Sequence, residues 1–453
     1  MRDLLLVLIV IAASLVALRR PWVGVLLWVW LSLMNPHRYA YGIAYDAPLA
    51  AVAAACTLIG LLATRDRQSP YYSMPAVLLT IFMVWMTLSW LFGVSPSEDY
   101  EQWKKVMKVD GMILVALALI RTRVQILTLA WVTALSLAVL GIKGGIFTAA
   151  NGGNYRVWGP PGTFIADNNE FALALIMVIP LVRFLQMQAT SRFLRFALLA
   201  TAVLCATAAL GSYSRGALLA ITAMCLVLWW RGKKKAVNGV AIGLVAAGLL
   251  AFMPDQWGER MSTIESYEED RSALGRISAW WTAFNLAKER PFGIGFELAR
   301  PELFAQYSPY PDMVHAAHSI YFLVLGNHGF VGLFLFLAMW LVTWRQAQEV
   351  RWLSRGKPDL QWCGQLVSMC QVSLAGYAVG GAFLSLSYFD LPYYVLVLVV
   401  ATNRWVKLQQ TQVEPAPVWR HAWQGRLARL CGIADAKHPI PAVEPGRPAG
   451  ATP

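Results

Sequence analysis

Three basic side chains, those of Arg215, Arg276 and His318, are of types that could bind phosphate and accept a proton. Arg215 follows a turn of small residues between two apolar stretches, Arg276 lies in the longest polar segment, and His318 directly precedes another apolar stretch. A guanidinium binds phosphate oxygens through paired hydrogen bonds, and a neutral imidazole accepts a proton near neutral pH. These residue types could therefore stabilise a departing phosphate and deprotonate an attacking hydroxyl.

Each of these side chains also has a simpler interpretation. An arginine at the end of an apolar helix can extend its charge to the membrane surface, and a histidine there can be bound by backbone alone. His315 and His318 are three residues apart, a spacing that could bind a metal ion. A metal site also needs a third ligand, and only Asp312 is close in sequence. We predict that His318 is a general base and that neither a metal nor a cofactor is used.

A further group of polar residues precedes the apolar stretch at 170–186. Arg156 and Asn169 flank a Gly- and Pro-rich turn, and Asp167 or Asn168 could cap the helix that follows. An ordinary outer loop with a capped helix start explains this spacing by itself, so the spacing alone indicates no function.

The elements that must position these residues are membrane helices. The chain has 453 residues, of which 58% are hydrophobic and only 14% are charged, whereas about a quarter of a soluble domain is charged. A soluble enzyme is therefore excluded. Apolar stretches with few charges predict an all-α, polytopic integral membrane protein with about twelve transmembrane helices. There are thirteen stretches, and the first two, which are short and separated only by Arg19-Arg20-Pro21, could form a tight or re-entrant hairpin. The stretches are 4–18, 21–34, 48–64, 75–93, 106–120, 125–146, 170–186, 194–210, 215–230, 236–253, 319–343, 364–387 and 391–405.

Loop charges predict the orientation and the domain organisation. Lys and Arg concentrate in alternate short loops, as at Arg231–Lys235, and the positive-inside rule places those loops in the cytoplasm. The net charge of +13 then reflects loops that face anionic lipid rather than nucleic acid. We divide the chain into transmembrane helices with short loops, a long outer loop that carries part of the active site, further transmembrane helices, and a cytoplasmic tail that is first amphipathic and then disordered. Their ranges are 1–253, 254–318, 319–407 and 408–453.

Taken together and in order, the motifs resemble those of the O-antigen ligase/polymerase superfamily of bacterial inner membranes. The amino-terminal half is similar to the branch of exosortase-A-associated O-glycosylation ligases. The motifs are Arg156 to Gly159, Asn169-Glu-Phe-Ala172, Ser214-Arg215-Gly216-Ala217, Arg276 to Trp280 before Pro291-Phe-Gly-Ile-Gly295, and Ala317-His318-Ser319 with Leu323 and Gly329.

The resemblance implies an activity. Such a protein is a GT-C-type, metal-independent, inverting glycosyltransferase that moves a glycan from undecaprenyl diphosphate to a hydroxyl of lipid A–core on the periplasmic face. The functional residues would be His318, Arg215 and Arg276, with Arg156, Asn169 and His315 also binding substrate. Ser319 stands where many members have Asn, and His328 lies where an acidic residue is common.

Other functions remain open. A polymerase or a protein O-oligosaccharyltransferase of the same superfamily would carry the same motifs. A transporter of lipid-linked glycans is a further alternative, but transporters place ionisable groups near the middle of the membrane. The candidate residues instead lie at the predicted outer boundary, which favours an enzyme.

Overall fold

The computed structural model describes residues 2–232, 234–262, 271–409 and 431. Within these residues every regular element is a helix and there is no strand, so the all-α prediction is confirmed for this part of the chain. The longer helices are α1 (Arg2–Arg19), α2 (Pro21–Met34), α4 (Leu49–Ala63), α5 (Met74–Leu91), α6 (Pro96–Leu119), α7 (Arg123–Ala150), α8 (Asn168–Gln188), α9 (Arg192–Leu210), α10 (Arg215–Arg231), α11 (Lys235–Phe252), α13 (Arg271–Glu289), α15 (Ile320–Leu353), α16 (Gln361–Gly380) and α17 (Asp390–Gln409).

Short helices connect them. They are η1 (Pro36–Tyr39), α3 (Ile43–Asp46), η2 (Pro70–Tyr72), α12 (Asp255–Ser262), α14 (Pro301–Tyr307), η3 (Pro358–Leu360) and η4 (Gly381–Phe383).

The helices suit a membrane. Seven helical segments in the described part of the chain are long and apolar enough to cross a bilayer, and α2 and α4 are shorter apolar helices. The protein is therefore a multi-pass membrane protein. The predicted apolar stretches fall on helices, except that 364–387 runs past the end of α16 through η4 into a non-helical segment at 384–387. The predicted total of about twelve crossings and the predicted orientation stay predictions.

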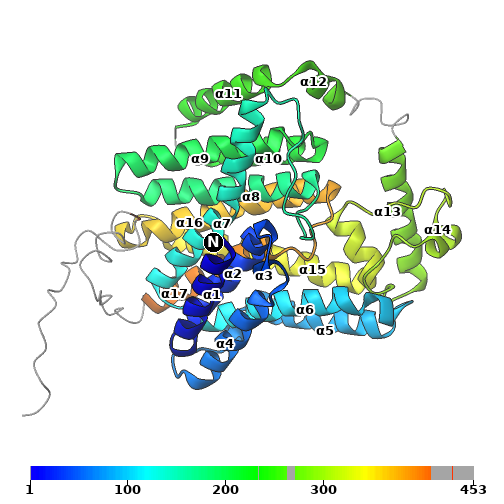
Figure 1. Ribbon diagram of the computed structural model, residues 1–453, viewed down its shortest axis with the longest axis horizontal. Coiled ribbons are helices and arrows are strands. Elements are labelled where there is room, and N and C mark those ends of the chain that lie inside the picture. The colour runs from blue at the N-terminus through cyan, green and yellow to red at the C-terminus, as the bar shows by residue number, and fades with distance from the viewer. Residues whose placement is uncertain (1, 233, 263–270, 410–430, 432–453) are drawn as a thin grey trace, which may run out of the picture.

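The centre of the molecule is a packed bundle. Helices α7, α8 and α9 pack against one another, α16 packs on α8, and α17 lies among α6, α7, α15 and α16. Figure 1 shows α8, α9 and α10 side by side in the upper half of the view, with α13 and α14 at the right-hand end. In α17, Tyr393 and Tyr394 are completely buried, which identifies this helix as part of the core.

The segment predicted as a long outer loop is largely helical. Residues Arg271–Glu289 form α13, which packs on α14 and α15. In the turn after α13, Gly295 lies against Asp99 of α6. The Asp99 carboxylate accepts a hydrogen bond from the Phe296 amide (2.8 Å) and pairs with Arg300 (2.7 Å). The Gly293/Gly295 pair therefore forms a turn that packs on neighbouring elements. The predicted amphipathic helix of the tail lies outside the described residues.

One helix of the bundle is bent at a glycine. Gly329 in α15 has φ 69° and ψ −173°, a conformation that only glycine adopts readily. A Cβ atom at this position would lie 2.3 Å from the carbonyl oxygen of Pro291. The bend lets the turn after α13 pack directly on α15.

We expect Gly329→Ala to lower the thermal stability of the purified protein. The backbone conformation alone costs about 1–3 kcal/mol for a residue with a Cβ, and the contact with Pro291 adds to it. Gly356→Ala is the matched control, because Gly356 also has a positive φ (70°) but open space around it. Thermal unfolding in detergent measures both, and equal losses would show that the contact with Pro291 has no effect.

Candidate functional site

The turn before α10 places Arg215 at the first position of the helix. The Ser214 side chain caps the helix by accepting a hydrogen bond from the Ala217 amide (3.2 Å), as a serine at this position commonly does. Tyr213 has a left-handed backbone (φ 61°) that turns the chain sharply, and the Asn168 side chain donates to the Ser212 carbonyl oxygen (2.6 Å). The predicted helix start is therefore correct, and it is tied to the start of α8.

The Gly- and Pro-rich loop before α8 covers the same turn. The Tyr213 hydroxyl donates to the Gly153 carbonyl oxygen (2.7 Å), and the Val157 amide donates to the Gly211 carbonyl oxygen (3.1 Å). The guanidinium carbon of Arg156 lies 5.9 Å from the centre of the Tyr213 ring. Arg156 thus contacts the residue that sets the position of α10.

His318 faces a carboxylate at the start of α8. Its Nδ1 lies 3.7 Å from Oε1 of Glu170, a buried side chain. The backbone of His318 is left-handed (φ 41°), which is uncommon outside glycine and favours asparagine, aspartate and histidine among the others. The carboxylate lies close enough to stabilise the positive charge that His318 would gain on accepting a proton.

Asp167, Asn169 and Glu170 form a local network at this helix start. Asp167 is the cap, because its Oδ1 accepts hydrogen bonds from the amide and the side-chain nitrogen of Asn169 (both 2.8 Å). Burial raises the pKa of Asp167, but hydrogen bonds with Glu170 and Asn169, together with the nearby His318, bring it below its ordinary value. The carboxylate therefore stays charged at neutral pH.

Asn169 is among the site residues predicted from the sequence, whereas Glu170 is not. In the structure the Asn169 side chain binds Asp167, whereas Glu170 faces the predicted base. An acidic residue in the first turn of a helix is common, because it complements the helix dipole. Only its place inside an apolar stretch, where a charge is costly, could have drawn attention to it.

The segment 381–387 brings the helix ends together. The Ser385 amide donates to Oε1 of Glu170 (3.4 Å), so the segment contacts the carboxylate beside the predicted base. A Cβ on Gly216, the residue after Arg215, would lie 3.2 Å from Cβ of Phe383. Because η4 also packs on α15, the starts of α8, α10 and α15 all meet at this segment.

Helix α13 brings Arg276 to the loop that ends in the predicted base. The Trp280 indole donates to the Ala317 carbonyl oxygen (2.7 Å). One turn earlier, a Cβ on Gly275 would lie 2.8 Å from Cδ2 of His315, so the two residues are in close contact. Arg276 follows Gly275 directly and therefore lies beside this loop.

His315 and His318 lie together. Their ring centres are 5.2 Å apart, and Nδ1 of His315 lies 3.0 Å from the Ala316 carbonyl oxygen. Across the described residues, no group of three or more His, Cys, Asp and Glu side chains could hold a metal ion. His328, by contrast, is fully buried, and its Nε2 contacts the Tyr388 hydroxyl (2.7 Å), so it is part of the core.

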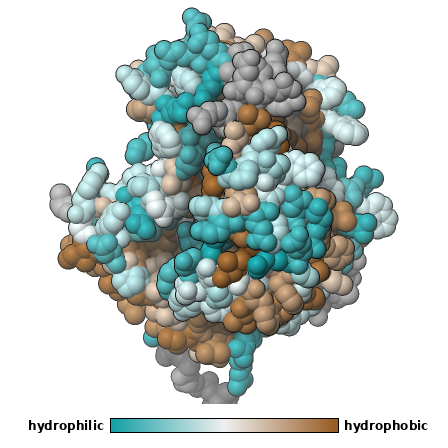
Figure 2. Space-filling view, turned by 90° about the vertical axis from the view of Figure 1, so that its right-hand side faces the viewer, coloured by the Kyte–Doolittle hydropathy of each residue, from teal (hydrophilic) through white to brown (hydrophobic). Residues whose placement is uncertain are grey.

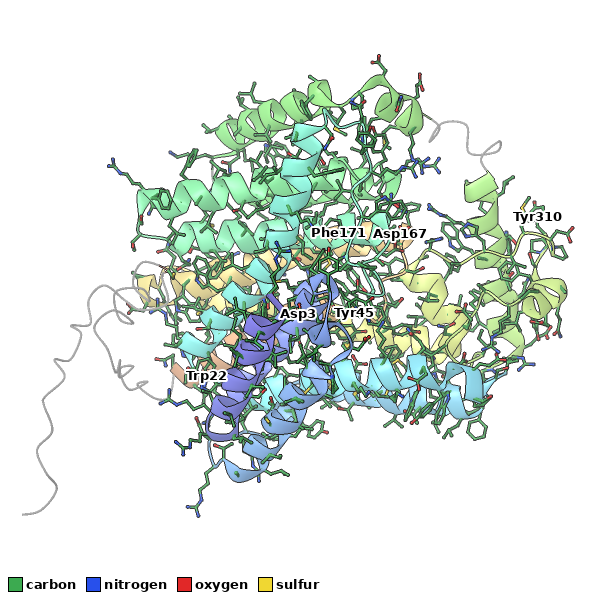
Figure 3. The ribbon with its side chains drawn as sticks, viewed as in Figure 1. Asp3, Trp22, Tyr45, Asp167, Phe171 and Tyr310 are labelled. Carbon is green, nitrogen blue, oxygen red and sulfur yellow. The ribbon has the colours of Figure 1, made fainter. Side chains whose placement is uncertain are left out.

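These residues gather at one end of the bundle. Figure 3 shows Asp167 at the end of α8 that faces α13 and α15. Figure 2 views the molecule from that side, and hydrophilic residues cover much of the face that includes α13 and α14, with apolar residues around its lower edge. A polar face bordered by apolar surface suits a site that receives substrates carried by lipids.

A family described as O-antigen ligase matches residues 200–337. This match supports the resemblance to the O-antigen ligase/polymerase superfamily for that part of the chain. Residues 1–190 match a second family, DUF5935, which is described as a family of unknown function. A search of the curated proteins finds no match.

The candidate site spans both matched regions. The O-antigen ligase region supplies Arg215, Arg276 and His318, whereas Arg156 and Glu170 come from the region of unknown function. The contact between Glu170 and His318 therefore joins the two regions at the site.

We expect Glu170→Gln to lower the turnover of the protein while leaving donor binding nearly unchanged. Glutamine keeps the size of the side chain but removes the charge that stabilises protonated His318, so the loss should be roughly tenfold. Glu302→Gln, at an exposed position of α14, is the matched control. Assays of turnover and of donor affinity on both variants test this, and unchanged turnover in Glu170→Gln would contradict the role.

Proposed function

We propose that this protein is an O-antigen ligase. It transfers a glycan from undecaprenyl diphosphate to a hydroxyl of lipid A–core on the periplasmic face of the bacterial inner membrane, with inversion and without a metal. The family match supports ligase- or polymerase-type chemistry. The observation that carries the finer proposal is the pairing of His318 with Glu170 at the segment where α10 also begins.

In the proposed reaction, the acceptor hydroxyl attacks the anomeric carbon of the glycan. The bond from that carbon to the diphosphate oxygen breaks, and the diphosphate leaves with the electron pair. The hydroxyl proton goes to His318, whose positive charge the carboxylate of Glu170 stabilises. The product is a new glycosidic bond, and undecaprenyl diphosphate is released.

Arg215 and Arg276 take the role of diphosphate ligands. The leaving group gains negative charge as the glycosidic bond breaks, and guanidinium groups already held in place stabilise that charge most in the transition state. Arg215 is held by the capped turn at Ser214, and Arg276 by the packing of α13 on the loop before His318. Both residues come from rigid helices, which favours such preorganisation.

The test of this function is transfer by the purified protein. A lipid-diphosphate glycan is supplied with lipid A–core, with a second lipid-linked glycan, or with an acceptor protein. We expect transfer to lipid A–core alone. Extension of the second glycan would identify a polymerase, and transfer to protein would identify an O-oligosaccharyltransferase. Movement of the donor across a vesicle membrane without transfer would identify a transporter. Each of these outcomes contradicts the ligase.

We also expect EDTA to leave transfer unchanged. The described residues around His318 supply only two neighbouring imidazoles, and no group of three side chains that could hold a metal ion. Turnover is measured before and after chelation, with EDTA-treated buffers throughout. Loss of activity that one divalent metal restores would instead assign His315 and His318 as its ligands.

A further inference from the structure

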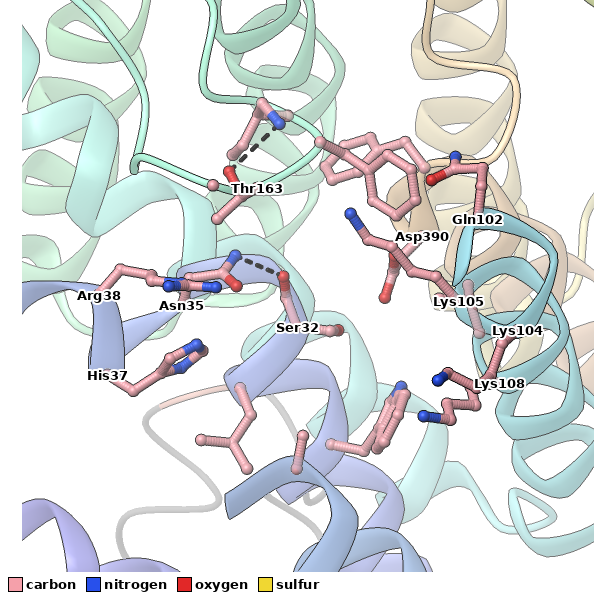
Figure 4. Close-up of a pocket in the computed structure, with 18 of the residues that line it drawn as sticks. Ser32, Asn35, His37, Arg38, Gln102, Lys104, Lys105, Lys108, Thr163 and Asp390 are labelled. Carbon is pink, nitrogen blue, oxygen red and sulfur yellow. Dashed lines mark hydrogen bonds between the residues drawn. The ribbon is translucent and has the colours of Figure 1, made fainter. Parts of the chain in front are cut away.

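A second cationic site lies in the region of unknown function. A cavity of about 460 Å³ is enclosed by the end of α2, η1, the first half of α6, the loop at 162–165 and the start of α17. Figure 4 shows its two sides: His37 and Arg38 approach from η1, and Lys104, Lys105 and Lys108 approach from α6. Its volume is typical of a pocket for a small ligand or a lipid headgroup.

The charges in the cavity do not cancel. Four Lys and Arg side chains line it against two carboxylates, those of Glu101 and Asp390. Lys104 pairs with Glu101, at 2.5 Å between Nζ and Oε1. Asp390 lies beside Lys105, and the two charges interact. The excess positive charge therefore belongs to Arg38 and Lys108.

Arg38 and Lys108 have no carboxylate partner among the residues that the structure describes. The Nε of Arg38 is buried without a hydrogen-bond acceptor. Its guanidinium stacks over Tyr45 (5.1 Å) and lies against Gly162, where a Cβ would be 3.4 Å from its Cζ. A buried donor without an acceptor is costly, so this arrangement favours an anion that supplies one.

Local contacts order parts of the cavity wall. Asn35 has a left-handed backbone (φ 51°), and its side chain donates to the Ser32 carbonyl oxygen (2.7 Å), which fixes the turn into η1. The Thr163 hydroxyl donates to the Pro160 carbonyl oxygen (2.8 Å), and Nζ of Lys105 lies 3.7 Å from the Phe164 ring centre. These contacts fix the turn into η1, the loop at 160–165 and the position of Lys105.

We propose that this cavity binds a phosphate group of a phosphorylated glycolipid, which is the chemical class of the acceptor. The assignment to the acceptor rests on the proposed function, whereas the binding of phosphate rests on the cavity alone. Arg38 supplies a planar pair of donors and Lys108 a second charge from the opposite wall, an arrangement that suits a phosphate. Arg215 and Arg276 bind the diphosphate of the donor in this arrangement.

The loop at 151–167 connects the two sites. Its residues 162–165 line the cavity, and Asp167 a little further on caps the helix that carries Glu170. A glycolipid whose phosphate occupies the cavity would therefore have its sugars near the start of α8. This placement gives the two lipid-linked substrates separate anion sites on one side of the proposed reaction.

Binding of lipid A, a bisphosphorylated glycolipid, to the full chain in phosphatidylcholine nanodiscs tests the proposal without any need for transfer. We expect Arg38→Gln and Lys108→Gln each to weaken binding by about ten- to hundredfold, as the loss of a hydrogen bond between charged groups would. Lys143→Gln is the matched control, because Lys143 lies over Tyr39 (4.5 Å) and does not line the cavity. Arg215→Lys should still bind lipid A normally.

Dephosphorylated lipid A provides a test on the wild-type protein that does not depend on how the variants fold. It should bind about as weakly as the Arg38→Gln variant binds intact lipid A. Equal affinity for both lipids, or unchanged affinity in Arg38→Gln and Lys108→Gln, overturns the proposal. If inorganic phosphate binds as tightly as lipid A, the ligand is a free anion. If the Arg38→Gln and Lys108→Gln variants instead lose binding to the lipid-diphosphate donor, the cavity is the donor site. Both results overturn the assignment to the acceptor.

Discussion

Replacement of His318 by alanine should reduce turnover by roughly 10²–10⁴-fold, the usual contribution of a general base. The imidazole accepts the proton of the attacking hydroxyl and has no contact with the diphosphate in the proposed reaction, so donor affinity should change little. Turnover and donor affinity therefore separate in this variant. Titration with the lipid-diphosphate donor, followed by a transfer assay, measures the two quantities on one preparation.

The control for His318→Ala must separate chemistry from folding. His318→Gln keeps a polar side chain of similar size and should be as inactive as the alanine variant, while both should unfold near the temperature of the wild type. A His318→Ala protein with near-normal turnover refutes the base role. His315, whose ring centre lies 5.2 Å away, is then the next residue to replace.

Replacement of Arg215 or Arg276 by lysine should lower both donor affinity and turnover. Lysine keeps the charge but loses the planar pair of donors, so each change should cost about ten- to hundredfold in turnover. The pattern differs from that of His318→Ala, because the arginines bind the diphosphate in the ground state as well as in the transition state.

Arg192→Lys is the matched control for these two changes. Arg192 is exposed at the start of α9, far along the helix from the turn before α10. Donor affinity and turnover should both be unchanged in it. Arg215→Lys and Arg276→Lys proteins that behave like this control would remove the arginines from the mechanism.

The helices could be predicted from sequence because the bilayer imposes a simple requirement. A segment that crosses it must satisfy its own backbone hydrogen bonds and expose apolar side chains, so uncharged stretches mark helices. The helix α6 shows the limit of this rule. It begins at Pro96 rather than near 106, since proline and the acidic residues Glu98 and Asp99 favour a helix start without being apolar.

The contacts within the candidate site could not be predicted in the same way. Glu170 and His318 are far apart in the chain, and nothing in either neighbourhood specifies that they meet. The second cationic site has the same origin, because Arg38 and Lys108 converge only after α2 and α6 pack. Local sequence patterns predict Arg215, Arg276 and His318 as site residues. The residues that contact them depend on tertiary packing.

The left-handed backbone of His318 has a consequence for attempts to stabilise the protein. Among the described residues, the non-glycine positions with positive φ are His318, Tyr213 and Asn35, and each adjoins a group assigned here to substrate chemistry. Glycine at any of them would relieve a conformation that costs of order 1 kcal/mol. Selection for thermal stability alone would therefore favour glycine at the very positions where the geometry of the site is set, and a screen for robust variants of this enzyme would have to select for transfer at the same time.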